Sequence, residues 1–257
     1  MPPGRYPRLR FSLRTAFIAT TVLCIALGWH LHATRRQQQA VEAIRETGGW
    51  VAYDYAWKDG GWVKGGKSWA PAWLTSALGE DALHRVVAVN ASALFHSAHD
   101  EHGHYYGPDP DAVMPGELWQ AIASLRSTQW LCLNARSLSD DELRHLRGLP
   151  CLTELKMEAV PIDGSGLEHL VSVPNLRDLN LSRIHLKDEH AHWLPQMKQL
   201  RVLGLNDSTI SPPVAAELQQ KMPLCKQYYE PWPPDPPPAQ PEIGIRIDLP
   251  GESETDE

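Results

Sequence analysis

Four histidines lie within nine residues of each other, and imidazole is the side chain of this sequence best suited to metal chemistry. They are His96, His99, His102 and His104. Neutral imidazole nitrogens bind zinc, copper or nickel well, and four can converge if the segment folds around an ion. However, no His-Glu-x-x-His motif or paired cysteine signature accompanies them. We therefore expect a hydrated loop with adventitious metal affinity and assign no metal or cofactor. An envelope metal site or a hydrolytic centre on this loop is the alternative.

Other catalytic arrangements are not evident from residue spacing. No Ser-His-Asp set, glycine-rich phosphate loop or pair of carboxylates can be placed from the sequence. The cysteines Cys24, Cys132, Cys151 and Cys225 have no paired spacing, which predicts free thiols. The sequence therefore favours a protein that is not an enzyme.

The elements that would hold the histidine loop repeat with a period of 24 residues. The pair Leu131 and Leu133 alternates at period two, as in a strand with one buried face. The pair recurs as Leu155 and Met157, then Leu179 and Leu181, then Leu203 and Leu205. Downstream leucines, such as Leu143 and Leu146, fall three apart, which is typical of a helix or a 3₁₀ turn. A period of this length predicts a solenoid of strand, turn and helix units.

Helix-start signals and the end units fit the same register. The segment 139–142 (Ser-Asp-Asp-Glu) forms a capping box, and Ser211-Pro212 places proline at the first helical position. The first unit has its predicted strand at Val87 and Val89. Its helical stripe consists of Trp119, Ile122 and Leu125, which leaves about twenty extra residues, placed as a His-rich insertion at about 91–112. We expect residues 226–230 to form the last strand, so the array spans about 84–230.

The stretch from Leu131-Cys132-Leu133 to Leu152 resembles a leucine-rich repeat of the short, bacterial, ribonuclease-inhibitor-like kind. The resemblance implies an α/β fold: a short solenoid with parallel strands on its inner face and helices outside. The asparagine that forms a buried hydrogen-bonding ladder in many such repeats has no counterpart here. The matching positions are Arg136, Val160, Ile184 and Ser208.

The N-terminus carries a candidate membrane span. Residues 15–34 contain 20 residues without a charged Lys, Arg, Asp or Glu side chain, enough to cross a bilayer as a helix. Four arginines precede this span, at positions 5, 8, 10 and 14, and Arg35 and Arg36 follow it. This distribution favours a cytoplasmic segment 1–14, an uncleaved signal anchor and an exported repeat domain. A cleaved signal peptide is the alternative.

Three N-terminal segments support the predicted membrane location. Residues 11–15, 26–29 and 40–45 resemble a group of bacterial membrane-anchored leucine-rich-repeat proteins. The resemblance implies a single-pass protein of the bacterial inner (cytoplasmic) membrane, without an assigned activity.

Between the anchor and the array we expect a juxtamembrane helix at 35–48, which spaces the domain from the membrane, and a capping region at 49–83. The capping region contains strands at 50–55 and 62–64 around an Asp59-Gly60 turn, then a helix at 71–83. Five tryptophans are expected to cover the apolar end of the array, with a carbohydrate-binding platform as the alternative. They are Trp50, Trp57, Trp62, Trp69 and Trp73.

The C-terminal segment 231–257 has eight prolines and seven acidic residues against one arginine, so it carries −6 of the net charge of −7. This composition predicts a disordered acidic tail. Residues 243–249 alternate apolar side chains at period two, and such a segment could pair with an exposed sheet edge.

The inner sheet face is the predicted binding surface, because residues between the buried leucines point outward. The candidate partner-binding residues are Trp130, Glu154, Lys156, Glu158, Asp178, Asn180, Ser182, Asn206 and Tyr228. This polar surface of mixed charge fits a protein or peptide, with Trp130 and Tyr228 as anchors. An ordinary solvated sheet face or a structural envelope spacer is the alternative. No basic stripe tracks phosphates, so we expect no nucleic-acid partner.

Overall fold

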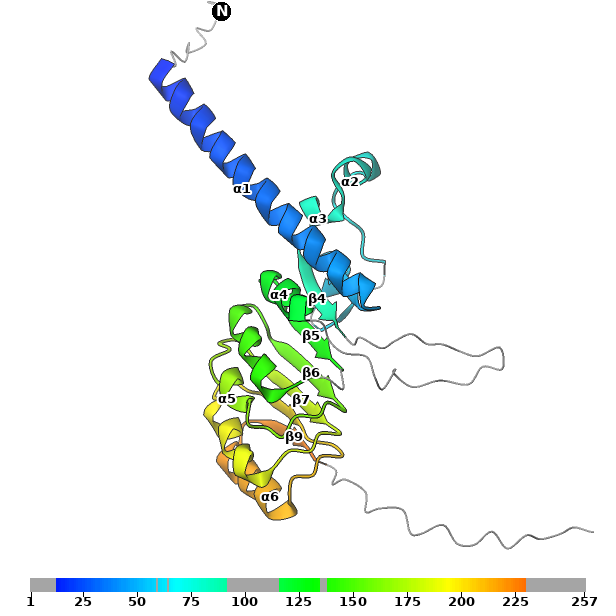
Figure 1. Ribbon diagram of the computed structural model, residues 1–257, viewed down its shortest axis with the longest axis vertical. Helices are drawn as coiled ribbons and strands as arrows, with labels where there is room; N and C mark the ends of the chain where they lie inside the picture. Colours follow the sequence, from blue (N-terminus) through cyan, green and yellow to red (C-terminus); the bar gives the residue numbers. More distant parts are fainter. Residues whose placement is uncertain (1–12, 59, 64, 92–115, 135–137, 230–257) are drawn as a thin grey trace, which may run out of the picture.

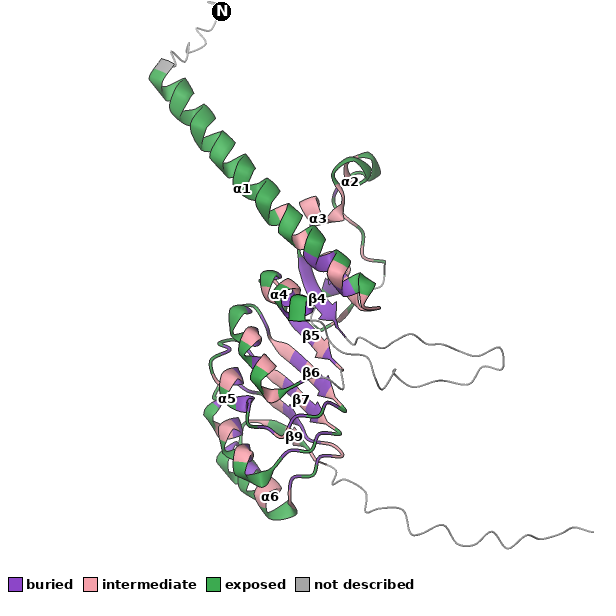
Figure 2. Ribbon diagram, in the orientation of Figure 1, coloured by how far each residue is buried: buried purple, intermediate pink, exposed green. Residues whose placement is uncertain are grey.

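The computed structural model describes residues 13–58, 60–63, 65–91, 116–134 and 138–229. A long helix, α1 (Leu13–Glu46), leads into a domain built on one seven-stranded sheet (Figure 1). Within these residues, α1 is the one helix long and apolar enough to cross a membrane, by length and composition. Figure 2 shows that most of its length is exposed.

Six parallel strands follow each other through the sheet in chain order. They are β4 (Val86–Asn90), β5 (Trp130–Leu133), β6 (Glu154–Glu158), β7 (Asp178–Ser182), β8 (Val202–Gly204) and β9 (Lys226–Tyr228). Leu131 lies opposite Leu155, which lies opposite Leu179, and Leu203 follows in the same row. The strand register therefore confirms the 24-residue period. A seventh strand, β1 (Trp50–Tyr53), pairs antiparallel with β4 at the edge of the sheet.

Five helical segments connect the parallel strands and lie along one face of the sheet (Figure 1). They are α4 (Gly116–Ser124), the 3₁₀ helix η1 (Asp140–Gly148), α5 (Leu167–Leu170), the 3₁₀ helix η2 (Asp188–Gln196) and α6 (Pro212–Lys221). Leucines three residues apart match the 3₁₀ period, and Leu143 and Leu146 are fully buried. The helix-start predictions are confirmed, since Glu142 Oε2 accepts the Ser139 N–H at 2.8 Å and Pro212 is the first residue of α6.

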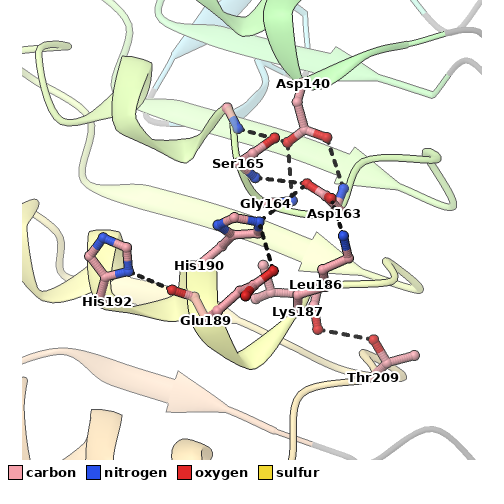
Figure 3. Close-up of polar contacts among 11 residues, drawn as sticks. Asp140, Asp163, Gly164, Ser165, Leu186, Lys187, Glu189, His190, His192 and Thr209 are labelled. Carbon is pink, nitrogen blue, oxygen red and sulfur yellow. Dashed lines mark hydrogen bonds and ion pairs between the residues drawn. The ribbon is translucent and has the colours of Figure 1, made fainter.

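Carboxylates, rather than asparagines, join successive repeats at the turns that precede the helices (Figure 3). The Asp140 carboxylate accepts backbone N–H groups of the next repeat, from Asp163 at 2.9 Å, Gly164 at 3.0 Å and Gly166 at 2.8 Å. Gly166 permits this close approach, because a Cβ there would collide with the Asp140 carbonyl. Asp188 lies two periods after Asp140 and accepts the backbone N–H of Ser211 at 2.9 Å.

The same turns hold an ion pair between repeats. Lys187 Nζ donates to Asp163 Oδ2 at 2.7 Å (Figure 3). This bond, followed by the backbone N–H of Ser165, holds the pKa of the Asp163 carboxyl well below its usual range. Further along, Thr209 Oγ1 donates to the carbonyl of Leu186 at 3.0 Å. Side chains thus join successive repeats at these turns.

The register of the first repeat differs from the prediction by two residues. Val89, rather than Val87, lies opposite Leu131. The step from Val89 to Leu131 is 42 residues, so this repeat carries 42 − 24 = 18 extra residues instead of twenty. Side-chain alternation has a period of two, so a shift of two residues leaves the buried face unchanged and is invisible in the pattern.

The end of the array is covered mainly by α1, and only Trp50 and Trp57 of the five tryptophans pack against its first strands. The last turns of α1 bury Ala40, Val41 and Ile44 in the main core, against α4. Residues 35–46 therefore continue α1 directly into the domain instead of acting as a spacer. Trp69 and Trp73 are 71% and 70% exposed, so these two tryptophans are not part of the core.

The segment between β1 and β4 also departs from the prediction. Residues 50–55 do not pair with the strand after the turn. Instead, β2 (Trp57–Lys58) and β3 (Gly61–Trp62) form a separate hairpin. The expected helix at 71–83 is two helices, α2 (Ala72–Leu78) and α3 (Glu80–Leu83), because Gly79 adopts a φ of 82° between them.

Candidate functional site

The sheet has one face without helices, which we call the open face. Along β6 and β7 every second residue is fully buried toward the helices, and the residues between them are half-buried on the open face. This confirms the predicted side-chain directions. The open face consists of Trp130, Cys132, Glu154, Lys156, Glu158, Asp178, Asn180, Ser182, Val202, Gly204, Asn206, Lys226 and Tyr228.

Tryptophans fold over the β5 end of the open face. The Trp50 ring stacks on Trp130, with centroids 5.6 Å apart and planes at 15°. Trp57 from the β2–β3 hairpin lies 5.1 Å from Trp130, and Trp62 lies 5.4 Å from Trp50. Trp130 and Trp57 are each only 7% exposed, whereas Trp62 is 62% exposed. The hairpin therefore forms an aromatic wall, and Trp62 is its accessible ring.

Glu154 links this wall to the polar part of the face. Its Oε1 accepts the indole N–H of Trp130 at 3.0 Å and lies 3.1 Å from Lys156 Nζ. Lys156 Nζ also lies 5.6 Å from the Trp130 ring centroid, within the range of a cation–π interaction. The hairpin turn comes close to this carboxylate, because a Cβ on Gly60 would lie 3.0 Å from Glu154 Oε2. Glu154 and Lys156 are thus already engaged within the chain.

Asp178 is the acceptor on this face that remains available. It lies beside Glu154 in the strand register and is half-buried. Within the part of the chain that the structure describes, no hydrogen bond or ion pair reaches its carboxylate. Burial, followed by the negative charge of Glu154, raises the pKa of Asp178. A cationic group or an N–H donor from a partner would offset both the cost of burying the Asp178 carboxylate and its repulsion from Glu154.

The β9 side of the face is shallower and more exposed. On β8, the Asn180 side chain packs directly over the buried Gly204, since a Cβ there would come within 3.2 Å of it. Asn180 Oδ1 accepts the Ser182 hydroxyl at 2.5 Å. Asn206 Oδ1 is buried without a hydrogen-bond donor among the described residues. At the edge, Lys226 Nζ lies 5.0 Å from the exposed Tyr228 ring.

The outcome for the predicted residues is mixed. Eight of the nine lie on the open face as half-buried or exposed side chains, from Glu154 to Tyr228. Trp130 is also on this face, but it lies beneath Trp50 and Trp57 and cannot serve as an anchor for a partner. Sequence reasoning missed Trp62 as the accessible ring. The signal was the pair Trp57 and Trp62 on either side of a turn.

The cysteines add no nucleophile to the face. The Cys132 thiol lies between the tryptophan wall and Lys156, and burial raises its pKa to about 11. Burial raises the pKa of Cys225 as well. Both thiols therefore stay protonated near neutral pH, and a protonated thiol is a poor nucleophile. All four cysteines carry free thiols.

A Ser-His-Asp arrangement that residue spacing did not reveal occurs beside β1. His84 Nε2 lies 2.7 Å from Ser68 Oγ, and His84 Nδ1 lies 3.1 Å from Asp54 Oδ1. The contacts follow the order of a hydrolytic triad, but the burial is reversed, with the His84 side chain 1% exposed and Asp54 46% exposed. Tyr55 packs edge-on against the imidazole at 4.6 Å, and Ser68 Oγ already accepts the Ala70 N–H at 3.0 Å. The network satisfies a buried histidine and holds residues 68–70 in place.

The described residues contain no group of three or more His, Cys, Asp or Glu side chains that could hold a metal ion. The histidines His96, His99, His102 and His104 lie outside the described residues, as do the acidic tail and its segment 243–249. The metal-binding alternative therefore stays a prediction.

The sequence matches no protein-family model and no curated protein. Among solved structures, the chain is similar to a leucine-rich-repeat protein of Leptospira interrogans, with 19% identity over 45% of this chain and 34% of that protein, and a TM-score of 0.33. It is also similar to an internalin (InlF) of Listeria monocytogenes, with 14% identity over 44% of this chain and 39% of that protein, and a TM-score of 0.29. The chain thus spans less than half the length of either protein. The mixed α/β fold with a parallel sheet rests on the strand register described above.

Proposed function

We propose that this chain is a single-pass membrane protein that displays a leucine-rich-repeat solenoid and binds a protein or peptide on the open face without catalysis. The Asp178 carboxylate carries the proposal. It is half-buried beside Glu154 and no described residue bonds it, so the free protein holds an unfavourable charge that a partner's lysine, arginine or N–H group would stabilise.

The surroundings of Asp178 favour a polypeptide partner. Exposed aromatic rings lie at both ends of the face, Trp62 at one end and Tyr228 at the other. Aromatic side chains of this kind dominate binding energy at protein interfaces. An extended peptide with basic and apolar residues fits the order of these groups along the open face.

The proposed location is supported by α1. Its apolar stretch is exposed along its length, and it carries arginines on both sides with more of them before it. We propose that α1 is an uncleaved signal anchor in a bacterial cytoplasmic membrane, with the N-terminus in the cytoplasm and the repeats exported. In this orientation, the open face lies on the exported side of the cytoplasmic membrane.

The test is site-specific photo-crosslinking of the full chain in native membranes. The crosslinking residue replaces Asn180 or Tyr228 on the open face, and replaces the exposed Lys198 on the opposite side as the matched control. We expect a discrete adduct from the open-face positions alone, lost in an Asp178→Lys variant. The same diffuse pattern from all three positions would contradict the proposal and leave a structural spacer as the better explanation.

A further inference from the structure

The helix α2 is apolar and has no covering partner in the described chain. Residues 72–78 include no charged side chain, and none of them is buried. Trp73 is 70% exposed and Leu78 is 52% exposed, while Trp69, just before the helix, is 71% exposed. We call these three side chains the α2 patch. A short apolar helix of this kind gains little stability in water from its own hydrogen bonds.

The α2 patch lies at the height of the last turns of the apolar stretch of α1. Gln37 Nε2 donates to Asp81 Oδ1 at 3.2 Å and to the His84 carbonyl at 2.8 Å, which fixes α3 against α1 just after that stretch. Figure 1 shows α2 beyond α3, at the level of the middle of α1 and away from the repeats. Trp29 on α1 is 77% exposed in this region. Tryptophans are concentrated at the two interfaces of a bilayer, where the ring is apolar and its N–H meets water.

A groove lined by arginines adjoins the same part of α1. It has a volume of about 820 Å³ and lies between residues 29–37 and the turns at 124–127 and 150–151, where strands begin. Arg36, Arg85 and Arg126 line it, and none of them forms an ion pair with a described residue. The acid in its lining, Asp81, is engaged by the Tyr53 hydroxyl at 3.1 Å and by Gln37. Guanidinium groups bind phosphate oxygens in a bidentate manner, so the groove is complementary to lipid headgroups.

The position of the patch is fixed from within the domain. The Ser68 hydroxyl lies 2.7 Å from His84 Nε2, and the His84 ring lies 6.1 Å from that of Trp69. His84 is buried next to β4, so the start of the α2 segment is tied to the sheet. The exposed tryptophans are therefore presented by a buried polar network, and not by a loose loop.

We propose that the α2 patch inserts into the interface of the bilayer that α1 crosses, while the arginine groove faces lipid phosphates. This inference rests on the membrane anchoring proposed above. Continuity with the apolar stretch of α1 and the positive charge of the groove identify the occupant as an anionic bilayer surface. The repeat domain then rests on the membrane through a second contact.

The test uses the full chain in phosphatidylcholine vesicles with a minority of phosphatidylglycerol, in a background with every cysteine replaced by alanine. An environment-sensitive fluorophore is attached to a single cysteine at one of three positions. Leu78→Cys probes the patch. Leu224→Cys is the matched control, because Leu224 is 81% exposed at the far end of the repeats. A variant that retains only Cys24 probes the anchor.

We expect doxyl lipids to quench the probes at residues 78 and 24 and not the probe at 224. A lack of quenching at 78 with quenching at 24 would overturn the second contact and leave the anchor intact. A lack of quenching at 24 would instead overturn the membrane anchoring itself. Replacing Arg85 and Arg126 by glutamine should reduce the quenching at 78, whereas Arg201→Gln, at a distant exposed site, should not. Equal quenching in all these variants would contradict the role of the groove.

Discussion

The indole rings of Trp50 and Trp130 stack 5.6 Å apart, and this pair decides which part of the sheet can meet a partner. Trp50 comes from the antiparallel edge strand, and Trp130 from the first strand of the regular repeats. Their contact turns a residue of the open face into a core residue. The accessible surface therefore begins at Trp62 and continues toward β9.

Trp130 and Trp62 should respond differently to truncation. Trp130→Ala removes a ring that is almost fully buried, so we expect a loss of about 3 kcal/mol in the free energy of unfolding. Trp62→Ala should cost less than about 1 kcal/mol, since most of its surface already faces water. Urea unfolding of the full chain in micelles, followed by far-ultraviolet circular dichroism, measures both. Equal losses for the two variants would contradict the described wall.

Asp140 should be among the most important polar residues for stability. Asp140→Ala leaves three backbone N–H groups of the next repeat without an acceptor, and we expect a loss of about 2–3 kcal/mol. Its neighbour Asp141 is exposed and, among the described residues, pairs with the exposed Arg144 alone, so Asp141→Ala should cost less than about 0.5 kcal/mol. The same unfolding measurement compares them. A small effect of Asp140→Ala would mean that water replaces the carboxylate.

The Asp178 carboxylate should lower the stability of the free protein and contribute to partner binding. Its pKa is raised in the folded state, so the ionised carboxylate destabilises the fold at neutral pH. Asp178→Asn should therefore increase stability near neutral pH. The gain should vanish below about pH 4, where the aspartate is protonated in both states. The same variant should weaken crosslinking to a partner. A loss of stability at neutral pH would show that Asp178 already has a favourable contact in the free protein.

Three repeats place a non-glycine residue in the left-handed region at the same position. They are Ala159, Arg183 and Asp207, with φ values of 54°, 54° and 52°. Ala159→Gly should raise stability by about 0.5–1 kcal/mol, because glycine adopts this conformation without steric cost. The matched change Ala216→Gly, at an exposed site within α6, should lower stability by about the same amount. The test is whether the two substitutions change stability in opposite directions, as measured from unfolding midpoints.

Ser68 should behave as a structural residue. Its hydroxyl contacts a histidine that is closed off from solvent, so a fluorophosphonate probe should not label the folded protein at this position. Labelling of Ser68 that disappears in His84→Ala would show that the network opens to a hydrolytic site. Ser68→Ala should instead lower the protection of the α2 segment in hydrogen exchange.

The repeat could be predicted from the sequence because each repeat depends on local rules. Alternation placed Leu131 and Leu155 on the buried side, and the segment 139–142 marked a helix start. Both depend on side chains within one or two periods, which a linear pattern records. The predicted polar ladder of the open face followed from the same alternation, as Lys156 and Asn180 show.

The remaining features depend on long-range contacts that no period encodes. The pattern gives the face on which Trp130 lies, but not that Trp57, in a hairpin more than one full repeat earlier, folds over it. Likewise, Ser68, His84 and Asp54 meet because β1 pairs with β4 and the Asp54 N–H donates to the Arg85 carbonyl. The bonds of Asp140 cross from one repeat to the next through a turn whose sequence carries no asparagine signal.

The continuity of α1 has a mechanical consequence. One helix of 34 residues, about 50 Å long, runs from the apolar stretch to Ile44 in the domain core without a break. Such a rod acts as a lever, so any tilt of its upper half swings the whole repeat array as one body. The length of α1 also sets the orientation of the array around the helix axis. One residue added within α1 would turn the open face by about 100° around that axis. The direction in which the domain presents Asp178, relative to the apolar stretch of α1, is thus determined by the length of a single helix.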